Sequence, residues 1–315
     1  MNLMLIIGIG IKLSLFLAVL SYGMQSTLDD VLYLFRRPGQ LARALVSMFV
    51  VMAVFVAVLV AFFDLNPVIE IALIALAVSP VPPILPNKAL KSGGSKSFTF
   101  GLLVAVSLLS VIVVPLALKF FGAVFGRQAD LSEISVGITI LTSVVLPLVI
   151  GMLIRHFAPD FSERFAAPLG KIAMLILILA CLPILIALFP LMWSLIGNGT
   201  ILAIIAFVLV GITAGHFLGG PDPDDRTVLA LATTSRHPAI AIALASAGVA
   251  ENETKLAVAA VFLYILVSGI VAAPYLAWLR NDTGKETAVN GARAAKNFRR
   301  GKPLGEQITG KKFKG

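Results

Sequence analysis

Charged residues are scarce in this chain, and acidic residues are the scarcest. Of its 315 residues only 13% are charged, with 16 Asp and Glu against 25 Lys and Arg, whereas 59% are hydrophobic. A soluble domain this apolar could not cover its surface with polar groups, so we predict an integral membrane protein. Ten of the 25 basic residues lie in the last 36 residues, and no basic face is interleaved with stacking aromatics, so nucleic-acid binding is not expected.

Cysteine is nearly absent as well, which limits the chemistry further. The single Cys181 lies in an apolar stretch; it cannot form a disulfide within the chain and does not predict a soft metal site. No cluster of His, Asp and Glu suits an acid/base pair or a metal centre. We therefore expect neither an enzyme nor a bound cofactor.

Long apolar runs are abundant. A span needs ~20 mostly apolar residues, because the hydrocarbon core is ~30 Å thick, and it must be helical because unpaired backbone groups are costly in lipid. The first run has no basic residues before it and no good cleavage site, so we expect it to be retained. We predict an all-α membrane protein with nine transmembrane helices, at 3–24, 41–63, 68–87, 98–121, 134–155, 169–190, 200–218, 227–247 and 255–279.

Basic residues in the short loops indicate the orientation. With nine spans, most loop cations, such as Arg36 and Arg155, fall on one side, and only Lys119, Arg127 and Lys255 fall on the other. We therefore expect a cell (inner) membrane protein with its N-terminus outside and its C-terminus in the cytoplasm. The basic segment 280–315 is expected to form a cytoplasmic tail without packed structure.

Two of the nine runs contain residues that interrupt helices. In the third run four prolines fall within residues 80–86, and each removes a backbone donor and obstructs the preceding turn. The eighth run reads Thr-Thr-Ser-Arg-His-Pro at 233–238, and an arginine near mid-membrane costs ~2.5–3.5 kcal/mol. Taken singly, each run could instead be an ordinary kinked helix.

The two interrupted runs occupy matching positions, each in the middle of a three-helix unit. An offset of five spans reverses the membrane orientation, which is the pattern of inverted repeats whose discontinuous helices meet near the bilayer midplane. The ends of the half-helices leave free N–H and C=O groups that bind polar solutes or ions. The predicted substrate and ion site comprises Ser79, Pro82, Pro83, Pro86, Asn87, Thr233, Thr234, Ser235, Arg236 and His237.

Four segments carry a pattern that is found together in one family. They are SYGMQSTLDDVLYLFRRPGQ, SPVPPILPNKALKSGG, VVLPLVIGMLIRHFAP and DDRTVLALATTSRHPAIAIALASAG. In this order and spacing they resemble the bile acid:sodium symporter family over roughly residues 3–279. The resemblance implies a panel of 3–24 and 134–190, a core of 41–121 and 200–279, and a nine-helix form that lacks the first of ten helices.

At the two interruptions the chain departs from that family. Sodium-coupled members read Pro-Gly-Gly-Thr-Ala-Ser-Asn where residues 80–86 are Pro-Val-Pro-Pro-Ile-Leu-Pro, and Glu-Val-Gly-Met-Gln-Asn where residues 232–237 are Ala-Thr-Thr-Ser-Arg-His. The resemblance thus implies that the sodium ligands, including the glutamate, are missing. Because a guanidinium stays charged at any usable pH, we hypothesise that Arg236 stands where relatives hold sodium or pairs with an anionic substrate.

Several roles stay open at this point. His237 either titrates near neutral pH and couples protons or remains a neutral hydrogen-bonding residue, so the coupling ion, sodium or proton, is undecided. Lys12 either faces the solute cavity or extends toward the lipid headgroups. Lys88 is either an anchor at the inner surface or part of a vestibule that attracts anions.

The leading interpretation is a secondary-active transporter that moves a small organic, anionic solute across the lipid bilayer by alternating access. Because the family's sodium ligands are missing, we do not expect coupling to sodium to be a requirement. An arsenite-efflux-like carrier, from a related branch, is an alternative. The resemblance to that branch implies a cysteine in the first interruption, and this chain has none there. A passive channel or a membrane enzyme is the alternative of another class, and it is disfavoured because polarity is concentrated at two points. The oligomeric state does not follow from the sequence.

Overall fold

The computed structural model describes residues 3–125, 138 and 141–299, and within these residues the regular structure is entirely helical. The start of the predicted fifth span, the Arg127 loop and the end of the tail from residue 300 lie outside the described residues. The chain divides into two compact units, Met1–Ala272 and Ala273–Gly315. All sites discussed below lie in the first unit.

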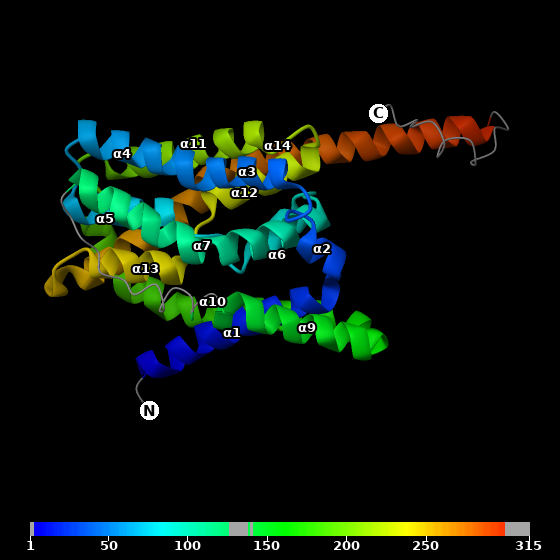
Figure 1. Ribbon diagram of the computed structural model, residues 1–315, viewed down its shortest axis with the longest axis horizontal. Coiled ribbons are helices and arrows are strands. Elements are labelled where there is room, and N and C mark those ends of the chain that lie inside the picture. Colours follow the sequence, from blue (N-terminus) through cyan, green and yellow to red (C-terminus); the bar gives the residue numbers. More distant parts are fainter. Residues whose placement is uncertain (1–2, 126–137, 139–140, 300–315) are drawn as a thin grey trace. The chain divides into compact units, whose positions relative to one another are not determined.

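The helices alternate between long spans and short segments (Figure 1). In chain order they are α1 (Leu3–Gln25), α2 (Leu28–Leu32), α3 (Pro38–Leu45), the π-helix η1 (Val46–Val51), α4 (Met52–Phe62), α5 (Pro67–Val78), α6 (Leu85–Lys91), α7 (Lys96–Phe125), the π-helix η2 (Leu141–Val145), α9 (Leu146–Phe157), α10 (Pro159–Ser194), α11 (Thr200–Leu218), α12 (Pro223–Thr234), α13 (Pro238–Ala247), the 3₁₀ turn η3 (Glu251–Glu253) and α14 (Thr254–Arg299).

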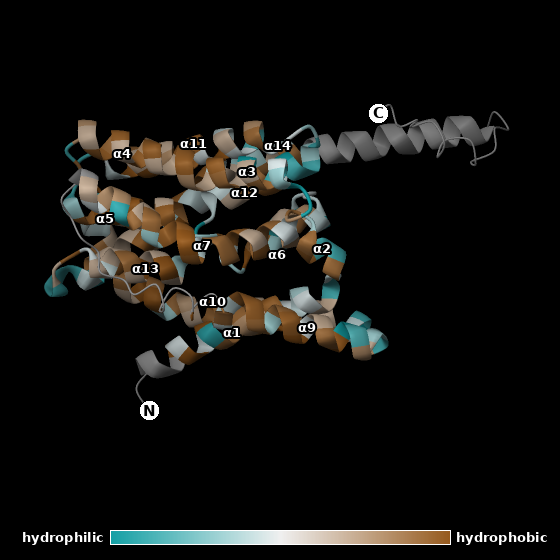
Figure 2. Ribbon diagram, viewed as in Figure 1, coloured by the Kyte–Doolittle hydropathy of each residue, from teal (hydrophilic) through white to brown (hydrophobic). Residues whose placement is uncertain are grey.

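Seven helical stretches in the described part of the chain are long and apolar enough to cross a bilayer. They match seven of the nine predicted spans, and the other two correspond to shorter apolar helices, Pro67–Val78 and Leu141–Phe157. Figure 2 shows hydrophobic residues along the lengths of these helices and hydrophilic residues mainly near their ends. This distribution is that of a multi-pass membrane protein, in which the apolar outer faces contact lipid.

Two element boundaries differ from the sequence prediction. The span predicted at 169–190 begins ten residues earlier, as α10, because Pro159 occupies its first turn, where a proline costs no backbone hydrogen bond. The last helix, α14, continues to Arg299 into the segment for which no packed structure was expected. Ten of the 20 residues at 280–299 are Ala, Arg, Lys or Glu, which favour helix without needing a packing partner.

The helices of the first unit form two groups. In one group α1 packs against α9 and α10 (Figure 1). The contact between α1 and α9 is a direct approach of backbones, because a Cβ on Gly151 would overlap the carbonyl oxygen of Leu20. In the other group α11 packs on α12, and α13 packs on α5. This second group contains both interrupted helices.

Candidate functional site

The first interruption separates α5 from α6. Ser79 ends α5 with an extended backbone, and prolines follow at 80, 82 and 83, so no helical hydrogen bonds can form until α6 begins at Leu85. Pro86 lies inside the first turn of α6, not in the interruption itself. Ser79, Pro82 and Pro83 are buried, so the non-helical backbone lies inside the protein, away from lipid, as a membrane interior requires.

The second interruption separates α12 from α13 and is shorter. Ser235 and His237 have extended backbones, and Pro238 starts α13 in a position where its missing N–H is tolerated. Thr233 and Thr234 are buried at the end of α12. Their hydroxyls donate to carbonyls one turn back, at Leu229 and Ala230, so both hydroxyls have hydrogen-bond acceptors within α12 itself.

The two interruptions touch each other. The backbone N–H of His237 donates to the carbonyl of Pro80 at 2.9 Å, and Arg236 Nη1 donates to the carbonyl of Ser79 at 3.1 Å. Nearby, Lys88 Nζ lies 3.4 Å from Ser235 Oγ. With α13 on α5 and α12 on α6, the half-helices cross, and we call the contact region Ser79–Pro80 with Ser235–His237 the crossing.

A π-helical turn supplies a further partner to the crossing. Arg236 Nη2 donates at 2.8 Å to the carbonyl of Met48, which lies in η1. Ser47 in the same turn lies 2.8 Å from Thr233 Oγ1, and it must donate, because the Thr233 hydroxyl already donates to Leu229. A π-turn widens the helix and disturbs its regular hydrogen bonding, which leaves a carbonyl available to an outside donor.

Two aromatic residues complete the surroundings of Arg236. The Phe207 ring on α11 lies 6.0 Å from the guanidinium carbon, within reach of a cation–π interaction. The Tyr264 hydroxyl on α14 donates to the carbonyl of Thr234 at the end of α12. The sequence did not predict these two residues or Met48. A tyrosine or phenylalanine within an apolar run has no distinguishing pattern, and a π-turn has no clear signature in the sequence.

The crossing is positively charged and contains no acid. Arg236 is only 4% exposed and His237 only 1%, and no described carboxylate lies within salt-bridge distance of Arg236. Arg236 Nε and both ring nitrogens of His237 are buried without a hydrogen-bond partner. Nowhere in the described residues do three His, Cys, Asp or Glu side chains form a group that could hold a metal ion. A sodium ion needs several oxygen ligands and does not fit beside this guanidinium, which is positively charged and already occupies the carbonyls of Ser79 and Met48.

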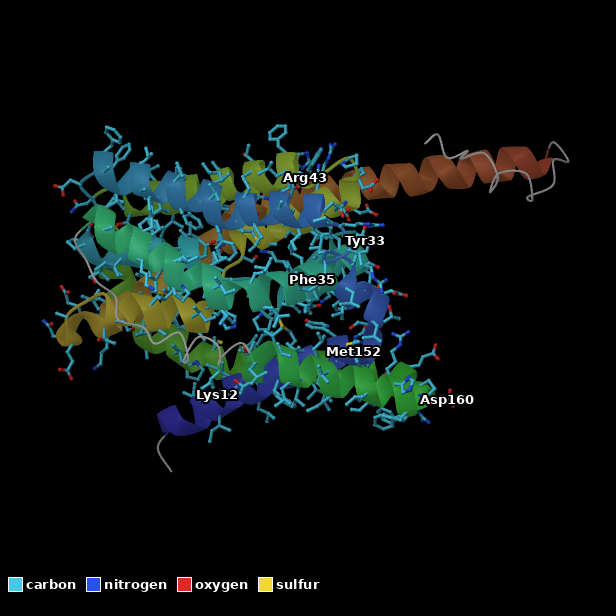
Figure 3. The ribbon with its side chains drawn as sticks, viewed as in Figure 1. Lys12, Tyr33, Phe35, Arg43, Met152 and Asp160 are labelled. Atoms are coloured by element: carbon cyan, nitrogen blue, oxygen red, sulfur yellow. The ribbon has the colours of Figure 1, made fainter. Side chains whose placement is uncertain are left out.

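The structure brings most of the predicted site residues together but not all of them. The residues at or beside the crossing are Ser79, Pro82, Pro83, Lys88, Thr233, Thr234, Ser235, Arg236 and His237. Asn87 is half-buried in α6, beside the Tyr22 hydroxyl of α1. Lys12 is exposed on α1, apart from the crossing (Figure 3).

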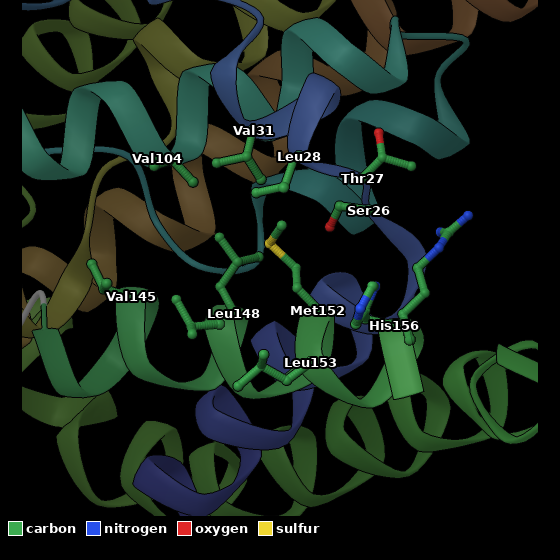
Figure 4. Close-up of a pocket in the computed structure, with 12 residues that line it drawn as sticks. Ser26, Thr27, Leu28, Val31, Val104, Val145, Leu148, Met152, Leu153 and His156 are labelled. Atoms are coloured by element: carbon green, nitrogen blue, oxygen red, sulfur yellow. The ribbon is translucent and has the colours of Figure 1, made fainter. Parts of the chain in front are cut away.

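A cavity of about 680 Å³ lies between α9 on one side and α2 and α7 on the other. Figure 4 shows Leu148 and Met152 of α9 facing Leu28, Val31 and Val104 across it. The lining is mainly apolar, and its polar and charged members lie at two places: Ser26 and Thr27 come just before α2, and Arg155 and His156 come from the last turn of α9. The sequence did not single out this cavity, because its walls come from segments far apart in the chain.

A second cavity, of about 500 Å³, lies between α1, α10 and the start of α7. It is more polar than the first, and its charged lining residues are Lys96, Arg155 and Glu163. Arg155 therefore borders both cavities. Phe100 also lines this cavity, and its ring contacts that of Tyr22, which in turn reaches Asn87 just beyond the first interruption.

Comparison with known protein families gives one result for the chain. No curated protein sequence matches it significantly. The sequence pattern of the Sodium Bile acid symporter family, a family of membrane transporters, matches residues 12–189. The match covers more than half of the chain, including most of α1, the first interruption, and both groups of helices in part. The chain therefore belongs to the sodium bile acid symporter family.

Proposed function

We propose that this protein is a secondary-active carrier that moves a small organic anion across the cell (inner) membrane by alternating access. The observation that carries the proposal is the contact between two interrupted helices, in which His237 and Arg236 bond to the backbone of Pro80 and Ser79. Carriers use such discontinuous helices to place helix ends and unwound backbone at mid-membrane. A passive channel would instead need a continuous polar path.

The proposed topology has nine spans, of which six form two inverted units of three, with the N-terminus outside and the C-terminus in the cytoplasm. The first unit comprises α3–α4, the α5–α6 pair and α7, and the second comprises α11, the α12–α13 pair and α14. In support, each unit has its interrupted helix in the middle, and α5 pairs with α13 while α6 pairs with α12. Such an exchange of halves is expected when one unit is inverted with respect to the other.

The moving parts of the proposed carrier are the two groups of helices. The α1–α9–α10 group would be the panel, and the helices around the crossing would be the core. Both cavities lie between members of these two groups. A rocking motion of panel against core would therefore open and close the space that holds the solute.

The substrate class follows from the lining of the cavities. A mainly apolar wall borders the larger cavity, with Arg155 at its edge. In the smaller cavity two cationic groups, Arg155 and Lys96, stand against one acid, Glu163. A guanidinium binds carboxylates and related oxyanions in two-pronged geometry. The combination favours a solute with an apolar body and one anionic group.

Counterflow in proteoliposomes tests this function. Vesicles loaded with an unlabelled monocarboxylate or sulfonate that has an apolar body are expected to accumulate the labelled compound transiently, which a channel cannot bring about. Arg155→Gln is expected to slow counterflow at least tenfold, since a charged hydrogen bond of ~1.5–3 kcal/mol is lost. Arg164→Gln is the matched control, because Arg164 is exposed and borders neither cavity.

Three results would contradict the proposal. Equilibration of label without an overshoot would indicate a channel. Transport of organic cations in preference to organic anions would show that the negative charge assigned to the solute is wrong. Equal counterflow by the Arg155 and Arg164 variants would remove Arg155 from the solute path.

A further inference from the structure

The guanidinium of Arg236 is bonded to main-chain oxygens from two separate elements and, within the described part of the chain, to no acidic side chain. Its Nη1 bonds to the carbonyl of Ser79, the residue that ends α5, and its Nη2 bonds to the carbonyl of Met48 in η1. The Ser79 carbonyl stands at the C-terminal end of α5, where carbonyls carry partial negative charge and lack partners within the helix. The Met48 carbonyl lies in the π-turn, where the regular hydrogen bonding is disturbed. The two carbonyls therefore form a site for a cation, and the chain itself supplies the cation.

A buried arginine without an acid is costly to keep, so its retention needs a reason. Burial of an unpaired charge is strongly unfavourable in a protein interior and in a membrane. Here the charge connects three elements of both proposed inverted units, since η1 and α5 come from one unit and Arg236, between α12 and α13, comes from the other. The guanidinium thus does what a bound ion does at the meeting point of discontinuous helices.

We propose that Arg236 is a resident cation that holds the crossing together, so that the carrier moves its solute without a coupling sodium ion. This inference rests on the proposed carrier function. A mobile cation ~5 Å from the guanidinium would be repelled strongly enough to weaken its binding on the order of a hundredfold at an effective dielectric constant of ~20. Lys88, whose Nζ lies 3.4 Å from Ser235 Oγ, adds a second positive charge beside the crossing.

Thermal unfolding of the purified full-length protein in matched salts tests the inference. The wild-type protein is expected to show the same Tm in equal concentrations of sodium, potassium and choline chloride. Arg236→Ala is expected to lower the Tm, and millimolar guanidinium chloride is expected to recover at least half of the loss, because the free ion can bond to the two vacated carbonyls. A ligand that binds only the folded state raises its stability by mass action.

Arg226→Ala is the matched control. Arg226 lies ten residues earlier in α12, and its Nε also donates to a backbone carbonyl, that of Gly220, at 2.6 Å. It is half-buried and lies outside the crossing, so guanidinium is not expected to stabilise this variant. Should Arg236→Ala fail to fold, Arg236→Lys keeps a positive charge and is expected to remain as indifferent to sodium as the wild-type protein.

Two outcomes would overturn the inference. One is a higher Tm of the wild-type protein or of Arg236→Lys in sodium than in potassium or choline. The other is a folded Arg236→Ala variant that guanidinium does not stabilise more than it stabilises Arg226→Ala. Because these measurements use simple salts, they can fail while counterflow of an organic anion succeeds, and the two proposals are judged separately.

Discussion

At the scale of single residues, buried polar groups outside the spans show how the connections of the fold are fixed. Asp30 in α2 accepts from the backbone and hydroxyl of Thr27 and from Ser97 Oγ. Lys96 Nζ lies 3.7 Å from the same carboxylate. Burial by itself raises the pKa of Asp30, but these hydrogen bonds and the lysine outweigh it, and the pKa lies below its usual value. Asp30 thus fastens α2 to the start of α7 as an anion.

The first prediction concerns the pH dependence of stability. Because the folded-state pKa of Asp30 is lowered, its ionised form contributes stability above about pH 4, the pKa range of an unfolded aspartate, and the contribution is lost as the pH falls through the folded-state pKa. Asp30→Asn is therefore expected to lower the Tm at pH 7 and to flatten the fall of Tm below pH 4.

Asp29→Asn serves as the control for this measurement. Asp29 is the neighbouring residue, and its ion pair with Arg36 is exposed to solvent, with an Asp29 side chain that is 81% accessible. Exposed ion pairs contribute little to stability. The Tm of Asp29→Asn, measured between pH 3 and 7 in steps of about one unit, should therefore follow the wild-type curve. An Asp30→Asn curve parallel to that of the wild-type protein would refute the role of Asp30.

The second prediction concerns the hydroxyl of Tyr264. It donates to the carbonyl of Thr234, in the last turn of α12, where carbonyls have no helical partner. Tyr264→Phe leaves that buried carbonyl unsatisfied and is expected to cost ~1–3 kcal/mol of unfolding free energy. Tyr33→Phe is the control, because Tyr33 is half-buried and its ring contact with Arg37 is kept. Equal losses in the two variants, measured by Tm, would contradict the prediction.

At the scale of elements, close approach of helix backbones sets the packing around the crossing. A Cβ on Gly215 of α11 would overlap the backbone of Ala230 in α12. A backbone atom cannot move aside as a flexible side chain can. The position of α12, and with it that of Arg236, therefore depends on a residue that has no side chain.

The third prediction follows from this contact. Gly215→Ala is expected to destabilise the protein by ~1–3 kcal/mol through overpacking. Gly269→Ala in α14 is the control, since nothing lies within 4 Å of the added Cβ, and there the better helix propensity of alanine is expected to raise stability slightly or leave it unchanged. Thermal unfolding of both variants decides the matter, and a tolerated Gly215→Ala would show that α11 and α12 can separate without cost.

The elements also show what the sequence can and cannot predict. Pro80, Pro82, Pro83 and Pro238 have a direct steric effect on helices, so both interruptions were predicted near their actual positions, although Pro86 proved to lie in α6 and Thr233 and Thr234 in α12. The all-helical membrane fold followed from apolar run lengths in the same way. The carbonyl of Met48, the ring of Phe207 and both cavities were not predictable, because they depend on contacts between distant segments and on a π-turn. The nine-span count and the inverted repeats remain predictions.

At the scale of the whole molecule, the proposed motion is of one helix group against the other. The fourth prediction uses cysteine pairs in a background in which the native Cys181 is replaced by alanine. Val104→Cys with Met152→Cys places thiols on opposite walls of the larger cavity. A short bifunctional thiol reagent is expected to stop counterflow in this variant, and reductive release of the link should restore it.

The control pair lies within the panel. Ser21→Cys with Ala166→Cys joins α1 to α10, where the Ser21 hydroxyl donates to the Ala166 carbonyl at 2.7 Å. Because these helices are expected to move together, linking them should leave counterflow intact. Full transport by the linked 104/152 pair, with cross-linking confirmed by mass spectrometry, would exclude relative movement across that cavity.

The absence of a side chain between α1 and α9 has a mechanical consequence. Because the backbones of these two helices touch at Gly151 and Leu20, we expect α1 and α9 to move together, and the proposed motion then requires bending where the α1–α9–α10 group joins the rest of the chain. One such joint follows α10, where Gly197, Asn198 and Gly199 all have positive φ angles. Glycine adopts many backbone angles at little cost. We therefore expect this short stretch to act as a hinge while the α1–α9–α10 group moves as a rigid body.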